Sequence, residues 1–205
     1  MKKNTIFTIL LSLATIAAFS QLDLKPAIGI NASRFDDDPI MDDGKDSLQA
    51  GSRAGYQIGA SLEIGNKIYI EPGIFYNKIN QSFTPTDFEK SDFDFNAGSI
   101  RVPVYLGWRF FGNTRSLAGF RIFIGPSLYI PLSVKENSYP VGKDDLKSPQ
   151  FDFSAGAGLN IWHLFLDVSY GWGLTPMFKD DPIESEMQSF YANLGFRFKL
   201  KKDEE

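Results

Sequence analysis

The chain has 205 residues, with 25 acidic and 21 basic side chains, no cysteine and a mean hydropathy of −0.17. The lack of cysteine excludes a disulfide framework and a thiolate metal site. The acidic balance argues against nucleic-acid binding, which needs a basic surface. The modest hydropathy is compatible with a membrane β-barrel, because barrel strands alternate polar and apolar residues.

Residues 1–20 have the pattern of a cleavable secretory signal peptide. Lys2 and Lys3 precede an apolar run from Ile6 to Phe19, and small residues stand three positions and one position before Gln21. The run is shorter than the roughly 20 residues of a spanning helix, and a buried helix or an uncleaved anchor is the alternative. Cleavage of the signal peptide would remove both lysines and change the formal net charge from −4 to −6.

After the signal, eight segments alternate apolar and polar residues with a period of two, which predicts β-strands. They cover residues 22–35, 53–64, 68–80, 100–110, 120–132, 151–161, 164–174 and 189–200. The intervening connections are alternately long and short, as in an up-and-down barrel with short periplasmic turns and longer external loops. The sequence therefore predicts an all-β fold, an eight-stranded antiparallel up-and-down transmembrane β-barrel with both termini in the periplasm.

Closure of this barrel follows from the chemistry of the bilayer. Lipid offers no water to an open sheet edge, and each unsatisfied backbone group there costs several kcal/mol. The last strand, 189–200, is therefore predicted to pair with the first strand, 22–35.

Alternation alone leaves open which face of the sheet points inward, because a soluble lipocalin-like carrier has its apolar face inside. The polar face here is rich in Gly, Ser and Asn, which suit a narrow lumen. It also carries charges that would be costly against lipid. We expect these charges to form a lumen network of Lys25, Glu63, Glu71, Arg101, Arg109, Arg121, Asp167 and Arg197.

Aromatic residues stand near both ends of the apolar face, as membrane interfaces favour. Tyr56, Tyr76 and Trp172 are expected toward the loops, and Trp108, Phe110, Phe120 and Phe198 toward the turns. These positions favour an apolar face that points to lipid.

The sequence offers weak candidates for catalysis or metal binding. His163 is the only histidine and lies in a predicted turn, with no nucleophile or orienting acid evident beside it. Segments 36–52 and 175–188 are acidic, but Asp43-Gly44 does not fit the spacing of a calcium loop. We therefore expect no catalytic residue, no metal site and no cofactor.

Several strand sequences resemble the PorT-like outer-membrane β-barrel family of Gram-negative bacteria. They are LKPAIGINAS, YIEPGIFYN, IRVPVYLGWRF, FIGPSLYI, FDFSAGAGLNI, LDVSYGWGL and LGFRF, in that order along the chain. The resemblance implies an outer-membrane barrel over residues 21–200, followed by a charged periplasmic tail, 201–205. One branch of that family is tied to protein secretion.

Together these observations predict a non-enzymatic outer-membrane protein with a structural or interaction role and a lumen filled by side chains. A small gated channel is the alternative, and a soluble lipocalin-like carrier is a further one. The expected partners are outer-membrane lipid, the outer-membrane insertion machinery, which recognises a terminal strand ending in an aromatic such as Phe198, and a protein bound by the external loops. We expect a monomer that binds no nucleic acid.

Overall fold

A computed structural model describes residues 21–35, 40–41, 46–85, 93–112, 117–135, 145–179 and 186–201. The predicted signal peptide and residues 202–205 of the predicted tail lie outside these ranges. The described residues contain no helix long and apolar enough to cross a membrane.

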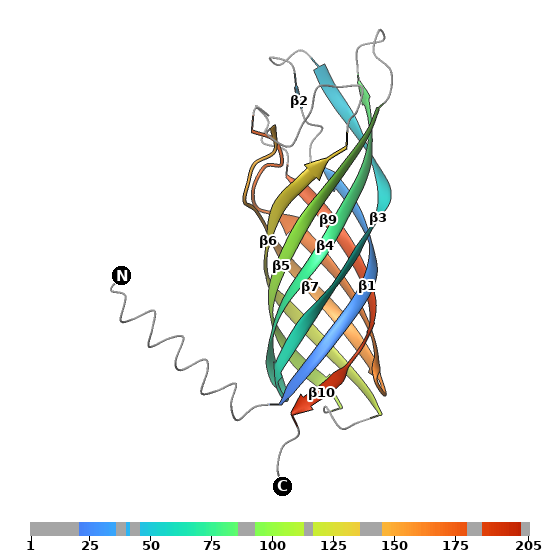
Figure 1. Cartoon of the computed structure of the whole chain (residues 1–205), viewed down its shortest axis with the longest axis vertical. Coiled ribbons are helices and arrows are strands. Elements are labelled where there is room, and N and C mark those ends of the chain that lie inside the picture. Colours follow the sequence, from blue (N-terminus) through green and yellow to red (C-terminus); the bar gives the residue numbers. More distant parts are fainter. Residues whose placement is uncertain are drawn as a thin grey trace, which may run out of the picture.

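Ten strands account for most of the described chain (Figure 1). They are β1 (Leu22–Phe35), β2 (Ile40–Met41), β3 (Asp46–Gly65), β4 (Ile68–Pro85), β5 (Phe93–Phe111), β6 (Ala118–Val134), β7 (Gln150–Ile161), β8 (Leu164–Gly173), β9 (Met187–Phe196) and β10 (Phe198–Lys201). The two-residue β2 pairs with the first residues of β3 and is not one of the eight barrel strands. Together, β9 and β10 form the predicted last strand.

The sheet closes into a barrel because β1 pairs with β3 on one side and with β9 and β10 on the other. All the pairings are antiparallel, and each remaining barrel strand pairs with its neighbours in the chain. The prediction of a closed eight-stranded antiparallel barrel is therefore confirmed.

The last strand is divided at Arg197. The register of the closing seam, with Ala27 opposite Gly195 and Leu24 opposite Phe198, places Pro26 opposite Phe196, the residue before the break. Proline has no N–H to donate, so the ladder between β1 and the last strand is interrupted there. On the other side of the strand, the Arg197 backbone N–H donates to the His163 carbonyl oxygen at 2.7 Å, which continues the pairing between β8 and β9. The strand resumes with the pair Leu24 and Phe198.

The strands β3, β4 and β5 are longer than predicted. Backbone pairing between β3 and β4 extends to Leu48 and Pro85, and pairing between β4 and β5 extends to Phe83 and Phe93. The predicted loops 36–52 and 81–93 are therefore partly strand. The apolar alternation ends before the strands do because a strand beyond the membrane does not need an apolar outer face. In β3, a bulge between Arg53 and Tyr56 also shifts the register and interrupts the alternation.

The barrel has two different ends, a turn end and a loop end. The turn end carries turns 65–67 and 162–163, the start of β1 and the end of β10, and the loop end is opposite (Figure 1).

The apolar face points outward. Ile28, Ile58 and Ile74 are each more than half exposed, whereas Asn31, Gln57 and other polar residues of the alternate positions are buried. This arrangement is the reverse of a soluble lipocalin-like carrier, so that alternative is wrong. The structure has its core inside the lumen and its apolar surface where lipid would be.

Candidate functional site: the charged lumen

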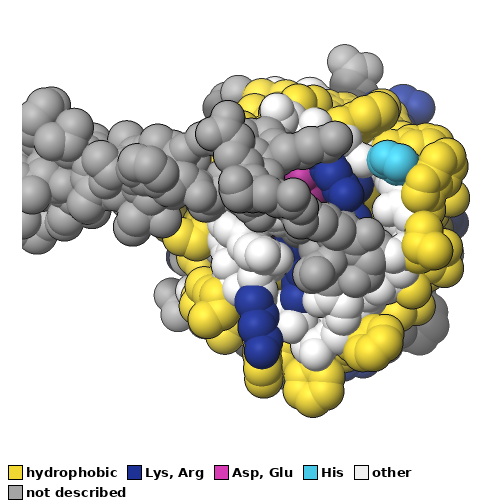
Figure 2. Space-filling view, turned by 90° about the horizontal axis from the view of Figure 1, so that it is seen from below, with side chains coloured by type: hydrophobic (Ala, Val, Ile, Leu, Met, Phe, Trp, Pro, Cys, Tyr) yellow, Lys and Arg dark blue, Asp and Glu magenta, His cyan; other side chains and the backbone are white. Residues whose placement is uncertain are grey.

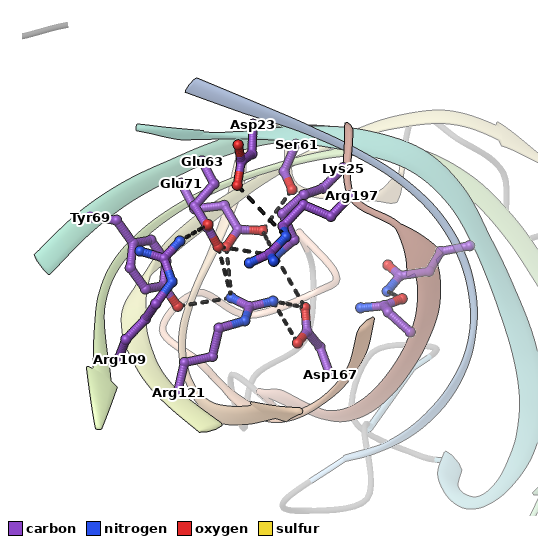
Figure 3. A network of polar contacts seen from close by, with 12 residues as sticks. Asp23, Lys25, Ser61, Glu63, Tyr69, Glu71, Arg109, Arg121, Asp167 and Arg197 are labelled. Atoms are coloured by element: carbon purple, nitrogen blue, oxygen red, sulfur yellow. Dashed lines mark hydrogen bonds and ion pairs between the residues drawn. The ribbon is translucent and has the colours of Figure 1, made fainter. Parts of the chain in front are cut away.

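Arg121 of β6 is at the centre of a buried ionic network at the turn end of the lumen (Figure 3). Its Nη2 donates to both oxygens of Asp167 on β8, at 2.6 and 2.5 Å. Its Nη1 donates to Glu71 Oε2 on β4 at 2.9 Å and to the Tyr69 hydroxyl oxygen at 2.8 Å. One guanidinium therefore joins opposite walls of the barrel.

Lys25 of β1 contacts the same carboxylates from another side (Figure 3). Its Nζ lies 2.8 Å from Glu71 Oε1, 3.6 Å from Glu63 Oε2 and 3.6 Å from Asp167 Oδ2. Ser61 also donates to Glu71 Oε1, at 2.6 Å. Lys25 thus holds carboxylates from three different strands within one cluster.

Two further ion pairs extend the cluster. Arg109 of β5 pairs with Glu63 of β3, and Arg197 Nε lies 3.7 Å from Asp23 Oδ2 across the closing seam. Viewed from the turn end, basic and acidic side chains lie inside a ring of hydrophobic ones (Figure 2).

The network is balanced in charge and buried. Its cations are Lys25, Arg109, Arg121 and Arg197, and its anions are Asp23, Glu63, Glu71 and Asp167. Each of these residues is at most 7% exposed. Buried charges are tolerated when they are paired and hydrogen-bonded, whereas a single charge left unpaired is strongly destabilising. The network therefore fixes the side chains that fill this end of the lumen.

Glycines on the lumen face make room for these large side chains. A Cβ at Gly158 would overlap the Asp167 carboxylate and lie 2.9 Å from Arg121 Nε. A Cβ at Gly107 would overlap the Tyr69 ring. An eight-stranded barrel is only wide enough for side chains to fill, so residues without a side chain are needed beside the large ones.

Arg101 is placed apart from this network, contrary to the sequence-based expectation. Its Nη2 donates to the hydroxyl oxygens of Tyr105, Ser127 and Ser154 at 2.5, 3.2 and 3.4 Å, and its guanidinium lies 4.0 Å from the Tyr191 ring centroid. Its position on β5 explains the separation, because Arg101 lies four inward-facing positions from Arg109, toward the loop end.

Side chains close the lumen between the two groups. Ala27, Phe75 and Phe165 form a buried apolar cluster. A cavity of about 20 Å³ lies between the ionic network and the Arg101 group, and it is lined by Glu71, Asp167, Arg101 and Tyr105 among others. Such a volume holds about one water molecule.

The predicted interface aromatics all lie on the outer surface. The exposed fractions are 47% for Tyr56, 42% for Trp108, 66% for Phe110, 37% for Phe120, 45% for Trp172 and 51% for Phe198, while Tyr76 is half-buried. Tyr56 and Tyr76 lie 6.4 Å apart on neighbouring strands. Trp108 and Phe110 also contact each other, with 5.3 Å between their rings.

Sequence reasoning missed three members of the network: Asp23, Ser61 and Tyr69. Each occupies an inward position of its strand, so the alternation itself could have included them. Ser61 and Tyr69 carry no charge that would mark them as members of an ionic network. Asp23 stands at the very start of β1.

His163 is exposed in its turn and packs edge-on against Trp162, with 4.4 Å between the rings. In the part of the chain that the structure describes, no group of three or more His, Cys, Asp or Glu side chains could hold a metal ion. The acidic segments 36–52 and 175–188 fall partly outside that part.

The closed barrel, its apolar outer surface and its polar lumen define an integral outer-membrane β-barrel protein. The model of the outer membrane protein beta-barrel domain family matches residues 17–179, and the chain belongs to this family.

Two solved barrels have a similar fold. OprG from Pseudomonas aeruginosa is 9% identical, with a TM-score of 0.56 over 89% of this chain and 97% of that chain. The neisserial surface protein A (NspA) is 14% identical, with a TM-score of 0.50 over 87% of this chain and 97% of that chain. At these identities the likeness concerns the fold alone. No curated protein matches the chain.

Proposed function

We propose that this protein is a non-enzymatic outer-membrane barrel with a structural or interaction role, whose lumen is sealed by side chains. The observation that carries the proposal is the charge-balanced network around Lys25 and Arg121, together with an adjoining cavity large enough for about one water. A pore needs a continuous hydrated path, and a paired, buried network opposes one because breaking it exposes unpaired charges.

Planar-bilayer recording of the purified full chain tests the sealed lumen. We expect no steady conductance, with a general porin reconstituted in the same way as the positive control. Heat-dependent electrophoretic mobility would show that the reconstituted protein is folded. A steady, ion-selective conductance by the folded protein would contradict the proposal and identify a small gated channel instead.

In the proposed role, the loop end faces outside and both termini face the periplasm. The long connections at the loop end would then contact extracellular partners, or the barrel would serve an export assembly, as one branch of the PorT-like family does. The barrel would act as a monomer delivered by the outer-membrane insertion machinery.

The partner is sought by affinity purification from gently solubilised membranes. A variant with the 175–188 connection replaced by a short Gly-Ser turn is the matched control. We expect a specific protein to be retained by the full chain and lost with the shortened loop. Retention by both forms would argue against recognition through this loop.

A further inference from the structure

Three basic side chains lie on the outer surface of the barrel near its loop end. Arg34 of β1 is exposed and has the same orientation as the lipid-facing Ile28 and Ile30. Arg53 of β3 is exposed and pairs with Asn80 of β4. Lys78 of β4 pairs with the outward-facing Tyr56.

These residues lie on adjacent strands at nearly the same level. Ala32 pairs with Ala54, which places Arg34 and Arg53 close to one another along β1 and β3. Lys78 and Asn80, the partner of Arg53, are two residues apart on β4. Two residues span roughly 7 Å along a strand and neighbouring strands are about 5 Å apart. Arg34, Arg53 and Lys78 are therefore called the basic belt cluster.

The basic belt cluster borders the aromatic edge of the apolar surface. Lys78 Nζ lies 5.9 Å from the centroid of the Tyr56 ring. Arg34 Nη2 donates to Gln188 Oε1 at 3.4 Å, and the Tyr170 hydroxyl also donates to that oxygen. These contacts hold the Arg34 and Lys78 side chains against the outside of the barrel. Aromatic rings mark the level of lipid headgroups, where Lys and Arg extend their charges from apolar surface.

The positive charge of the cluster contrasts with the sequence of the loops at the same end. Segment 36–52 carries Asp36, Asp37, Asp38, Asp42, Asp43 and Asp46 against Lys45. Segment 175–188 carries Asp180, Asp181, Glu184 and Glu186 against Lys179. A cationic group at the level of the aromatic residues fits an anion held at the membrane surface.

We propose that the basic belt cluster binds the phosphate groups of a membrane lipid in the leaflet at the loop end. Arginine matches phosphate with paired N–H donors, and lysine supplies a compact charge. Each basic residue close to a charged leaflet is expected to strengthen binding about fivefold. The inference goes beyond the proposed function, since it does not depend on whether the lumen conducts.

The proposal is tested by native mass spectrometry. The full mature chain is mixed in detergent with diphosphorylated lipid A, and lipid that stays bound after the detergent is removed is measured. The test variant is Arg34→Gln/Arg53→Gln/Lys78→Gln. The matched control, Lys135→Gln/Lys147→Gln/Lys179→Gln, removes three charges from the loop end without touching the cluster. Lipid A with both phosphates removed is the control ligand. Heat-dependent mobility shows that each variant is folded.

We expect the folded test variant to bind diphosphorylated lipid A about a hundredfold more weakly than the wild type. The control variant should remain within about threefold of the wild type, and dephosphorylated lipid should not distinguish the proteins. Equal weakening in both variants, or no weakening in the test variant, would overturn the proposal. Polyglutamate that binds the wild type as tightly as the lipid would also overturn it, because the surface would then be a general polyanion site.

Discussion

At the scale of single residues, the buried cations of the lumen have two kinds of surroundings. Lys25 is surrounded by carboxylates, whereas Arg101 is surrounded by hydroxyl groups and aromatic rings. Hydroxyl oxygens accept the guanidinium hydrogen bonds, and ring faces attract the cation without a full opposite charge. The two cations should therefore respond differently to neutralisation.

Neutralising Lys25 is expected to be costly. Lys25→Met keeps a side chain of similar length but leaves Glu63, Glu71 and Asp167 with fewer cations. We expect a loss of roughly 3 to 5 kcal/mol in the free energy of unfolding, measured by urea titration in lipid vesicles. Lys199→Met, at an exposed position, is the control and should change it by less than about 0.5 kcal/mol. Equal midpoints for the two variants would contradict the role given to Lys25.

Overpacking at the network gives a second prediction. In Gly158→Ala, the new methyl group would displace Asp167 or Arg121, which are held by two hydrogen bonds to each other. We expect a loss of about 1 to 3 kcal/mol in the same titration. Gly119→Ala, whose nearest contact would be the Phe111 carbonyl oxygen at 3.1 Å, should lose clearly less. A reversed order would show that the network adapts freely to the added group.

The inward positions were predictable from alternation, but the contacts between them were not. Period two assigned Lys25, Glu71 and Arg121 to the lumen, and the structure places them there. Strand tilt and register decide which of them meet, and those depend on all eight pairings. For the same reason Arg101 could not be separated from the network by sequence alone.

At the scale of the strands, the sequence predicted the portions that cross the membrane better than the portions outside it. A strand that faces lipid needs an unbroken apolar face, so its sequence alternates regularly and can be recognised as a strand. The outer parts of β3, β4 and β5 have no such requirement, so their residues were assigned to loops. The break at Arg197 was also missed, because it depends on Pro26 in a partner strand far away in sequence.

The terminal strand provides a prediction about assembly. Phe198 pairs opposite Leu24 on the closing seam and is 51% exposed on the outer surface. Phe198→Asp would place a carboxylate against lipid and remove the terminal aromatic, so we expect a strong reduction in folded protein. Quantitative blotting of heat-modifiable protein in outer membranes measures it. Deletion of Glu205 should leave the level unchanged, and a normal level of Phe198→Asp would count against this assignment.

At the scale of the whole molecule, the orientation of the barrel can be tested directly because the natural chain contains no cysteine. Lys179→Cys introduces a thiol at the loop end, and Asn66→Cys introduces one in a turn at the opposite end. A membrane-impermeant maleimide should label Lys179→Cys in intact cells and Asn66→Cys only after lysis. The opposite pattern would invert the proposed topology.

The equal numbers of cations and anions in the lumen network also bear on its response to voltage. Moving one elementary charge through 100 mV changes the energy by about 2.3 kcal/mol. A cluster of four cations and four anions that shifts as a unit carries no net gating charge. An electric field across the membrane should therefore exert little net force on the network, and we expect applied potentials of either sign to leave the proposed sealed lumen closed.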